Sequence, residues 1–206
     1  SLCFLLVSLN PSITLQAIFG RNPSGYGFDF SRFLKAVNAY YVIMFLGIGL
    51  LYPRFIQFYG QVSFAYLPLA ILLMIGMFLL EVSFSHGLRC LKAQKWLPLK
   101  LSVVGAASRP IDVVLTLSLA FFEEMTYRLL WFDILLQKWE LPFILVLLIT
   151  TIFYALNHLL MGKEILYAKL LTGLLYGIIY YWSGNIWLVL FIHIGGNLWI
   201  DCLSIY

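Results

Sequence analysis

The chain has 206 residues, of which 63% are hydrophobic and only 11% are charged, and its mean hydropathy is +0.95. A soluble domain of this length cannot hide so much apolar surface from water, so the composition excludes a soluble globular protein and indicates an integral membrane protein. The net charge of +4 does not indicate binding to nucleic acid, because the basic residues lie in short loops beside apolar segments.

Seven apolar segments follow one another along the chain, each close to the length of about twenty residues that a membrane-spanning helix needs. They are continuous rather than alternating between apolar and polar residues, which favours helices over the strands of a β-barrel. We therefore expect an all-α fold, a polytopic membrane helix bundle that forms a single domain over 1–206 with a catalytic core at 111–204. The predicted spans are 2–19, 36–52, 63–82, 111–131, 143–160, 165–182 and 186–204.

Lysine and arginine are distributed unevenly over the loops between these spans. One set of alternate loops carries only Arg54 and Lys138. The other set carries nine basic residues: Arg21, Arg32, Lys35, Arg89, Lys92, Lys95, Lys100, Arg109 and Lys163. The positive-inside rule places these nine residues, and the C-terminus with them, in the cytoplasm. The short loops favour the cytoplasmic membrane of a prokaryote as the location.

Residues 86–102 combine four basic residues with leucine and tryptophan. This pattern is typical either of an amphipathic helix that lies on the cytoplasmic face of the membrane or of a basic loop. Neither interpretation implies catalysis.

Three ionisable residues, Glu123, Glu124 and Arg128, lie inside the fourth apolar segment. Without partners at the bilayer centre they would together cost about 8–10 kcal/mol, so their presence indicates a working site. Glu124 and Arg128 are four residues apart with the acidic residue first, which favours an ion pair. Glu123 is rotated by about 100° from Glu124, and we expect it to face a polar cavity as a general base. Four other acidic residues lie near span ends and are expected to be solvated: Glu81, Asp112, Asp133 and Asp201.

Two of the three histidines lie in other apolar spans. His158 follows Asn157 near the end of the fifth span, and His193 lies in the seventh span, four residues before Asn197. A single buried histidine is more often a core residue, but two histidines and a carboxylate pair on three helices indicate a shared site. His193 and Asn197 lie on one helix face, and both can donate hydrogen bonds, as the stabilisation of an oxyanion requires.

In chain order these residues form the patterns Glu123-Glu124…Arg128, Tyr154…His158 and His193…Asn197, within about 75 residues of the C-terminal half. They resemble the Glu-Glu-x-x-x-Arg, Phe-x-x-x-His and His-x-x-x-Asn motifs of the CAAX protease and bacteriocin-processing (CPBP, also called Abi) family of intramembrane glutamate-type endopeptidases. Tyr154 stands where the family usually has Phe, and Leu129 where Gly is frequent, so the substrate class is not carried over. Residues 1–110 match nothing in the family.

The resemblance implies an intramembrane peptidase of the glutamate type. We expect no cofactor, with zinc as the alternative. In this peptidase Glu123, helped by His158, activates a water, and His193 and Asn197 stabilise the tetrahedral oxyanion. Glu124 and Arg128 hold the site together. The implied partners are the lipid bilayer and a peptide or protein with a membrane-associated segment, such as a prenylated tail, a peptide precursor or a sorting segment.

Other functions use the same residues. Glu123, His158 and His193 are a suitable set for zinc with a position open for water. No His-x-x-x-His or His-Glu-x-x-His pair lies on one helix, which favours the metal-free interpretation. A transporter or proton relay also uses intramembrane Glu and His, but no inverted repeat is visible. A non-enzymatic membrane scaffold is the third alternative.

The predicted spans contain one conflict. With untilted helices, Glu123 and His193 lie about 20 Å from the cytoplasmic face, whereas His158 lies within about 5 Å of it. A shared site therefore requires helix tilt, a later start of the fourth span, or an extension of the fifth span beyond Gly162.

Overall fold

The computed structural model describes residues 1–20, 29–53, 60, 63–99 and 109–204 of the chain, and every regular element among them is a helix. This confirms the predicted all-α fold. The α-helices are α1 Leu2–Val7, α2 Pro11–Phe19, α3 Phe30–Leu51, α4 Leu67–Ala93, α5 Pro110–Glu124, α6 Phe143–Leu156, α7 Lys163–Ser183 and α8 Ile186–Ser204. The other helical segments are the 3₁₀-helices η2 Phe64–Tyr66 and η5 Leu159–Met161 and the π-helices η3 Met125–Leu130 and η4 Asp133–Lys138.

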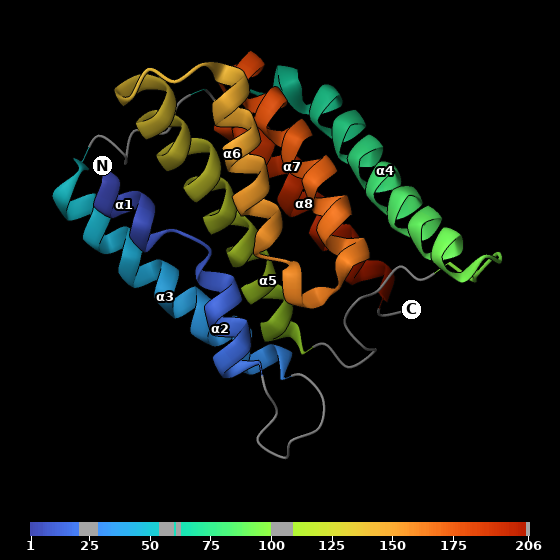
Figure 1. The fold of residues 1–206 in the computed structure, drawn as a ribbon. Coiled ribbons are helices and arrows are strands. Elements are labelled where there is room, and N and C mark those ends of the chain that lie inside the picture. The colour runs from blue at the N-terminus through green and yellow to red at the C-terminus, as the bar shows by residue number, and fades with distance from the viewer. Residues whose placement is uncertain (21–28, 54–59, 61–62, 100–108, 205–206) are drawn as a thin grey trace.

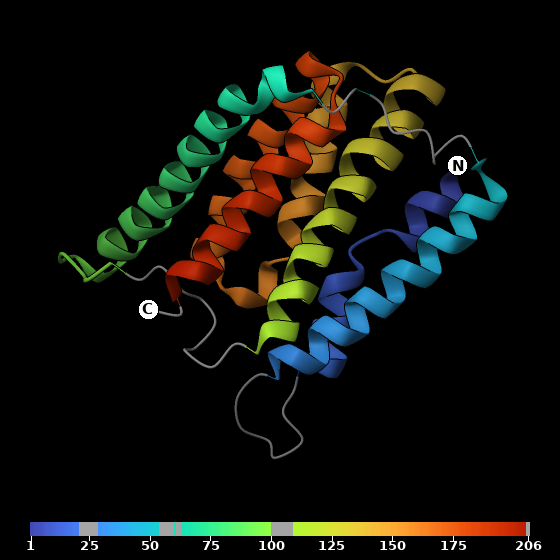
Figure 2. The same cartoon turned by 180° about the vertical axis from the view of Figure 1, so that it is seen from behind.

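The helices lie side by side in one bundle with α5 in its middle (Figures 1 and 2). α5 packs against α3 on one side and against α8 on the other. α6 and α7 form a closely packed antiparallel pair, and α4 covers α7 and α8 at one edge. The N-terminal helices α1 to α3 form the opposite edge. The central place of α5 means that residues from both edges can reach its side chains.

The surface of the bundle suits lipid rather than water. Among the described residues, four segments are long and apolar enough to cross a membrane, namely Leu2–Phe19, Phe30–Leu51, Leu67–Ala93 and Lys163–Ser183. The helix α6 and the first part of α8 are apolar but shorter. Large apolar side chains such as Ile43 and Leu50 of α3 point outward and are exposed. These features confirm the predicted membrane protein.

The segment predicted as the first span is not one continuous helix. α1 ends at Val7, and α2 begins at Pro11 after Asn10, whose φ of 45° is left-handed. Proline favours the first position of a helix, because it lacks the N–H that would be unpaired there and its φ is already helical. The break turns the side chain of Asn10 toward α6, where it donates a hydrogen bond to the carbonyl oxygen of Phe153.

The prediction of a separate interfacial helix over 86–102 is wrong for the described residues. α4 continues through this segment to Ala93, because no proline interrupts it. It ends at Gln94, whose φ of 50° is left-handed. Residues 95–99 are not helical, and 100–102 lie outside the described residues.

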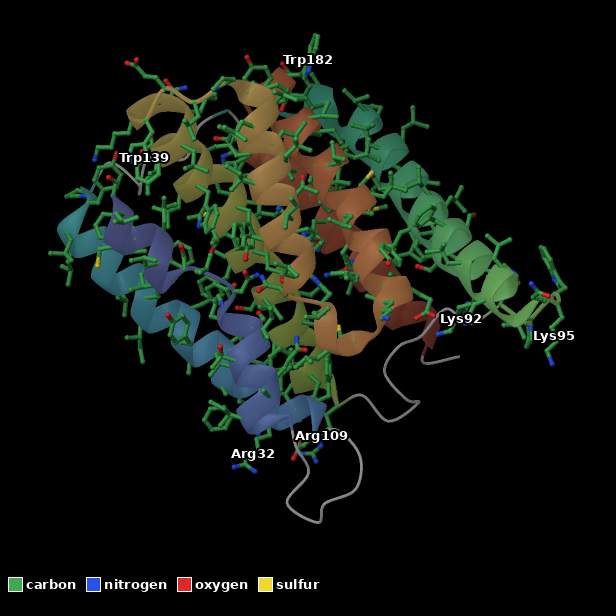
Figure 3. All side chains as sticks on the ribbon, in the orientation of Figure 1. Arg32, Lys92, Lys95, Arg109, Trp139 and Trp182 are labelled. Atoms are coloured by element: carbon green, nitrogen blue, oxygen red, sulfur yellow. The ribbon has the colours of Figure 1, made fainter. Side chains whose placement is uncertain are left out.

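Figure 3 labels four basic residues toward one end of the bundle and two tryptophans toward the other. The labelled residues are Arg32, Lys92, Lys95 and Arg109 at one end, and Trp139 and Trp182 at the other. Tryptophan favours membrane interfaces, and lysine and arginine favour the cytoplasmic side. The end with the four labelled basic residues therefore carries the signal of the cytoplasmic face.

Candidate active site

The acidic pair lies where the helix changes its winding. Glu123 and Glu124 are the last two residues of α5, and the chain continues from Met125 as the π-helix η3. Both carboxylates are buried, with exposed fractions of 3% and 0%. Single π-turns inside α-helices are often found at functional sites, because the wider turn changes the direction of the side chains around it.

The ion pair predicted between Glu124 and Arg128 is present. Arg128 Nε lies 3.2 Å from Glu124 Oε2, although the two atoms are not aligned as a hydrogen bond. Arg128 Nη2 donates a hydrogen bond to the carbonyl oxygen of Gly173 at 3.0 Å. The guanidinium also lies over the rings of Tyr154 and Tyr176, at 4.6 and 5.5 Å from their centroids. Arg128 is therefore held by α7 and by two aromatic faces as well as by its carboxylate.

His193 of α8 contacts the second carboxylate and not the first. Its Nδ1 lies 2.7 Å from Glu124 Oε1, in a buried hydrogen bond. The imidazole stacks on Tyr176, with ring centroids 4.9 Å apart and planes 24° apart. Glu124 thus contacts two side chains, Arg128 from the same helical run and His193 from α8.

His158 faces the first carboxylate. Its Nε2 lies 4.0 Å from Glu123 Oε1, which is longer than a direct hydrogen bond. Its Nδ1 lies 3.3 Å from the carbonyl oxygen of Tyr154. Because a carbonyl oxygen only accepts, this bond requires a proton on Nδ1 and leaves Nε2 of the neutral ring as an acceptor. Two acceptor atoms therefore face each other across a gap that suits one water molecule.

The short helix α6 removes the conflict in depth that the predicted spans produced. It has 14 residues, so it is about 21 Å long against a hydrocarbon core of about 30 Å. A helix of this length that begins at one membrane face ends before the other face, so the span lengths no longer require His158 to lie at the cytoplasmic face. Two of the expected solutions to this conflict are wrong. The fourth span does not begin later, because α5 begins at Pro110. The fifth span does not extend beyond Gly162, because α6 ends at Leu156 and η5 at Met161.

Tyr154 connects the two carboxylate–histidine pairs. Its buried ring lies 5.5 Å from the ring of His158 and 6.1 Å from the ring of His193, centroid to centroid. The same ring lies under the guanidinium of Arg128. The structure therefore gathers five of the six predicted site residues into one cluster.

Asn197 is the sixth predicted residue. It lies one turn after His193 on α8 and is half-buried. Within the described part of the chain, its side chain makes no hydrogen bond. Its spacing of four residues keeps it on the same helix face as His193.

The residues do not fit a zinc site in the arrangement described. Among the described residues, no three His, Cys, Asp or Glu side chains come together as a set of metal ligands. His193 Nδ1 is occupied by Glu124, whereas His158 faces Glu123. The three proposed zinc ligands, Glu123, His158 and His193, are thus divided between two pairs.

Several residues that support this cluster could not be recognised from the sequence patterns. Asn10 of the N-terminal segment donates a hydrogen bond to Asn157 Oδ1 at 3.1 Å. Gln16 donates one to the carbonyl oxygen of Asn157 at 2.9 Å. Tyr176 and Gly173 of α7 contact His193 and Arg128. The one available signal was the presence of the polar residues Asn10 and Gln16 within an apolar segment.

A second intramembrane ion pair lies beside the cluster. Lys169 Nζ of α7 lies 2.7 Å from Glu81 Oε1 of α4, and both side chains are largely buried. This pair joins α4 to α7, the helix whose Gly173 carbonyl oxygen accepts the hydrogen bond from Arg128.

The expectation of solvated acidic residues is therefore wrong for Glu81, and it is also wrong for Asp112, which is buried in the first turn of α5. Asp133 is half-buried and accepts a hydrogen bond from Tyr52 Oη at 2.7 Å. Asp201 lies outside the residues whose side chains are described.

Comparison with known protein families gives a match in the C-terminal half of the chain. Residues 107–199 match the family model described as "Rce1-like: Type II CAAX prenyl endopeptidase Rce1-like". No curated protein and no solved structure matches the chain. The matched segment contains both carboxylates, Arg128, both histidines of the cluster and Asn197.

Proposed function

We propose a glutamate mechanism for this chain, which belongs through residues 107–199 to the CAAX protease and bacteriocin-processing family of intramembrane proteases. The family makes the protein an intramembrane protease of the CAAX type that acts in a bilayer on a membrane-associated peptide. The finer proposal is that it is an endopeptidase in which a carboxylate activates water without a metal ion.

Glu123 is the general base, and His158 orients the water. The observation that carries this assignment is the gap of 4.0 Å between Glu123 Oε1 and His158 Nε2. A water about 2.8 Å from both atoms subtends an angle of roughly 90°, close to its own H–O–H angle. It would donate one hydrogen bond to each acceptor and keep a lone pair for attack.

The reaction then balances as an ordinary peptide hydrolysis. The water oxygen attacks the scissile carbonyl carbon while its proton passes to Glu123. The carbonyl π electrons become the oxyanion of a tetrahedral intermediate. When the C–N bond breaks, the proton on Glu123 passes to the leaving amine, and Glu123 returns to the carboxylate form.

His193 and Asn197 stabilise the oxyanion. The bond from His193 Nδ1 to the Glu124 carboxylate uses one ring donor. The Nε2 of His193 is the ring nitrogen that is left to donate to the oxyanion, and this requires a proton on each ring nitrogen. The amide N–H₂ of Asn197 supplies a second donor from the same helix face. Arg128 balances Glu124, so Glu124 and Arg128 support the site without touching the substrate.

The direct test compares Glu123→Gln with wild type in cells by quantitative peptidomics of membrane-associated peptides. Glutamine keeps the shape of the side chain but cannot accept a proton, so trimming of the substrate should fall by about 10²–10⁴-fold. Glu164→Gln is the matched control, because Glu164 pairs with Lys92 near the end of α4. If Glu123→Gln trims the same peptides as wild type, the proposal is wrong.

For the location, we propose a prokaryotic cytoplasmic membrane with the C-terminus in the cytoplasm. The arrangement in Figure 3 supports this orientation, because the basic end of the bundle is the end at which α8 terminates.

A further inference from the structure

The C-terminal end of α6 leaves a carbonyl group without a helical partner. In a continuing helix, the N–H of Asn157 would donate to the carbonyl oxygen of Phe153. It donates instead to the carbonyl oxygen of Tyr154 at 3.2 Å. Inside a membrane no bulk water is present to replace the lost bond, so another donor is needed.

Two side chains from the broken N-terminal segment supply donors at this point. Asn10 Nδ2 lies 2.5 Å from the carbonyl oxygen of Phe153 and 3.1 Å from Asn157 Oδ1. Gln16 Nε2 donates to the carbonyl oxygen of Asn157 at 2.9 Å. The break between α1 and α2 is what brings these two side chains to the end of α6.

Asn157 extends these contacts to the helix that carries the acidic pair. Its Nδ2 donates to Tyr127 Oη at 2.9 Å, and both side chains are buried. Tyr127 lies four residues after Glu123 on the same helical run. His158 is the next residue after Asn157, and η5 packs against α2. The hydrogen bonds on both sides of Asn157 therefore fix the backbone from which the His158 ring projects.

We propose that Asn10 and Gln16 are positioning residues that hold the end of α6 so that His158 Nε2 faces Glu123. They act through Asn157 and touch neither the water nor the substrate. Both lie outside the matched segment 107–199, so the N-terminal half completes the site. The effect on catalysis rests on the proposed function, whereas the effect on the His158 ring does not.

The first measurement is steady-state cleavage of a synthetic lipid-anchored peptide by purified variants. Asn10→Asp and Gln16→Leu keep the size of the side chain but remove the donor. A misplacement of the reacting groups by about 1 Å can reduce the rate by about 10²-fold. We expect kcat to fall by about 10- to 100-fold, with KM changed by less than about twofold. Ser12→Ala is the control, because Ser12 is as buried on α2 as Gln16, while among the described residues its Oγ makes no hydrogen bond to the end of α6.

The second measurement reads the ring itself and needs no activity. In protein labelled with ¹⁵N-histidine, His86, His158 and His193 each contribute a pair of ring-nitrogen signals. The variant His158→Gln assigns the pair that belongs to His158. Wild type and Ser12→Ala should show the His158 tautomer with a proton on Nδ1. The double variant Asn10→Asp/Gln16→Leu should show a mixture of tautomers, because the bond to Tyr154 is no longer held.

The two measurements separate the possible failures. An unchanged His158 signal in the double variant overturns the inference, whatever the activity. If wild type cleaves no peptide but the His158 signal changes as expected, the proposed function fails while the positioning role stands. Equal losses of kcat in Ser12→Ala and Gln16→Leu would also overturn the inference, because they would indicate a general effect of packing on α2.

Discussion

Arg128 compensates the buried negative charge of Glu124. It is 1% exposed and is the partner of a carboxylate that also binds His193. Removing one member of a buried ion pair leaves an uncompensated charge in a medium of low dielectric constant. The cation–π contacts with Tyr154 and Tyr176 add to the loss, because they vanish with the guanidinium.

We therefore expect Arg128→Met to lower the free energy of unfolding by about 3–5 kcal/mol. Denaturant unfolding in detergent micelles, followed by tryptophan fluorescence, measures this change. Lys92→Met is the control, since the ion pair between Lys92 and Glu164 is exposed and water screens it. The free energy of unfolding should fall much less in this variant. Equal losses in the two variants would show that the Glu124–Arg128 pair does not carry the stability assigned to it.

At the scale of elements, the packing of α6 against α7 determines where Tyr154 lies. A Cβ atom on Gly173 would lie only 2.7 Å from Tyr154 Cδ1. The two helices can approach this closely only because position 173 carries no side chain. The spacing of Gly173 and Gly177 is typical of such packing, and Gly177 likewise contacts Leu147 of α6.

Gly173→Ala should displace the Tyr154 ring and lower the free energy of unfolding by about 1–3 kcal/mol. Cleavage should fall as well, because this ring contacts His158, His193 and Arg128. Gly76→Ala on α4 is the matched helical control, since its Cβ would meet nothing within 4 Å. Alanine there should stabilise the helix slightly. The packing account is wrong if both variants behave alike.

Contacts within one helix could be predicted from the sequence, whereas contacts between helices and the end of α6 could not. The Glu124–Arg128 pair follows from spacing within one helix, and the structure contains it. The contact between His193 and Glu124 could not be predicted from the sequence. Contacts between helices depend on how each helix is rotated about its axis and how deep it lies in the membrane, which no single sequence segment encodes. The short α6 was missed because its apolar residues continue beyond Leu156, whereas the helix ends there. Hydropathy records only the apolar content, not the point at which the backbone changes direction.

At the scale of the whole molecule, the all-helical membrane fold could be predicted from composition and span length. The long α4 and the break between α1 and α2 could not. In both cases the position of proline explains the difference: α4 has no proline after its first turn and continues past a polar stretch, whereas Pro11 starts a new helix inside an apolar segment.

The orientation in the membrane is tested by thiol labelling of intact cells, in a background where Cys3, Cys90 and Cys202 are replaced by alanine. Gln137 is exposed at the tryptophan end of the bundle and Lys95 at the basic end. A membrane-impermeant reagent should label Gln137→Cys in intact cells, and Lys95→Cys only after the membrane is permeabilised. The reverse pattern would mean that the C-terminus is outside.

The central claim is that Glu123 activates water for peptide hydrolysis without a metal ion. The most direct test is to treat the purified protein with a chelator and to measure cleavage of a lipid-anchored peptide together with the zinc content per chain. We predict that cleavage persists with substoichiometric zinc, and that Glu123→Gln reduces it by about 10²–10⁴-fold under the same conditions. Stoichiometric zinc that disappears together with activity, or a Glu123→Gln variant as active as wild type, would contradict the account.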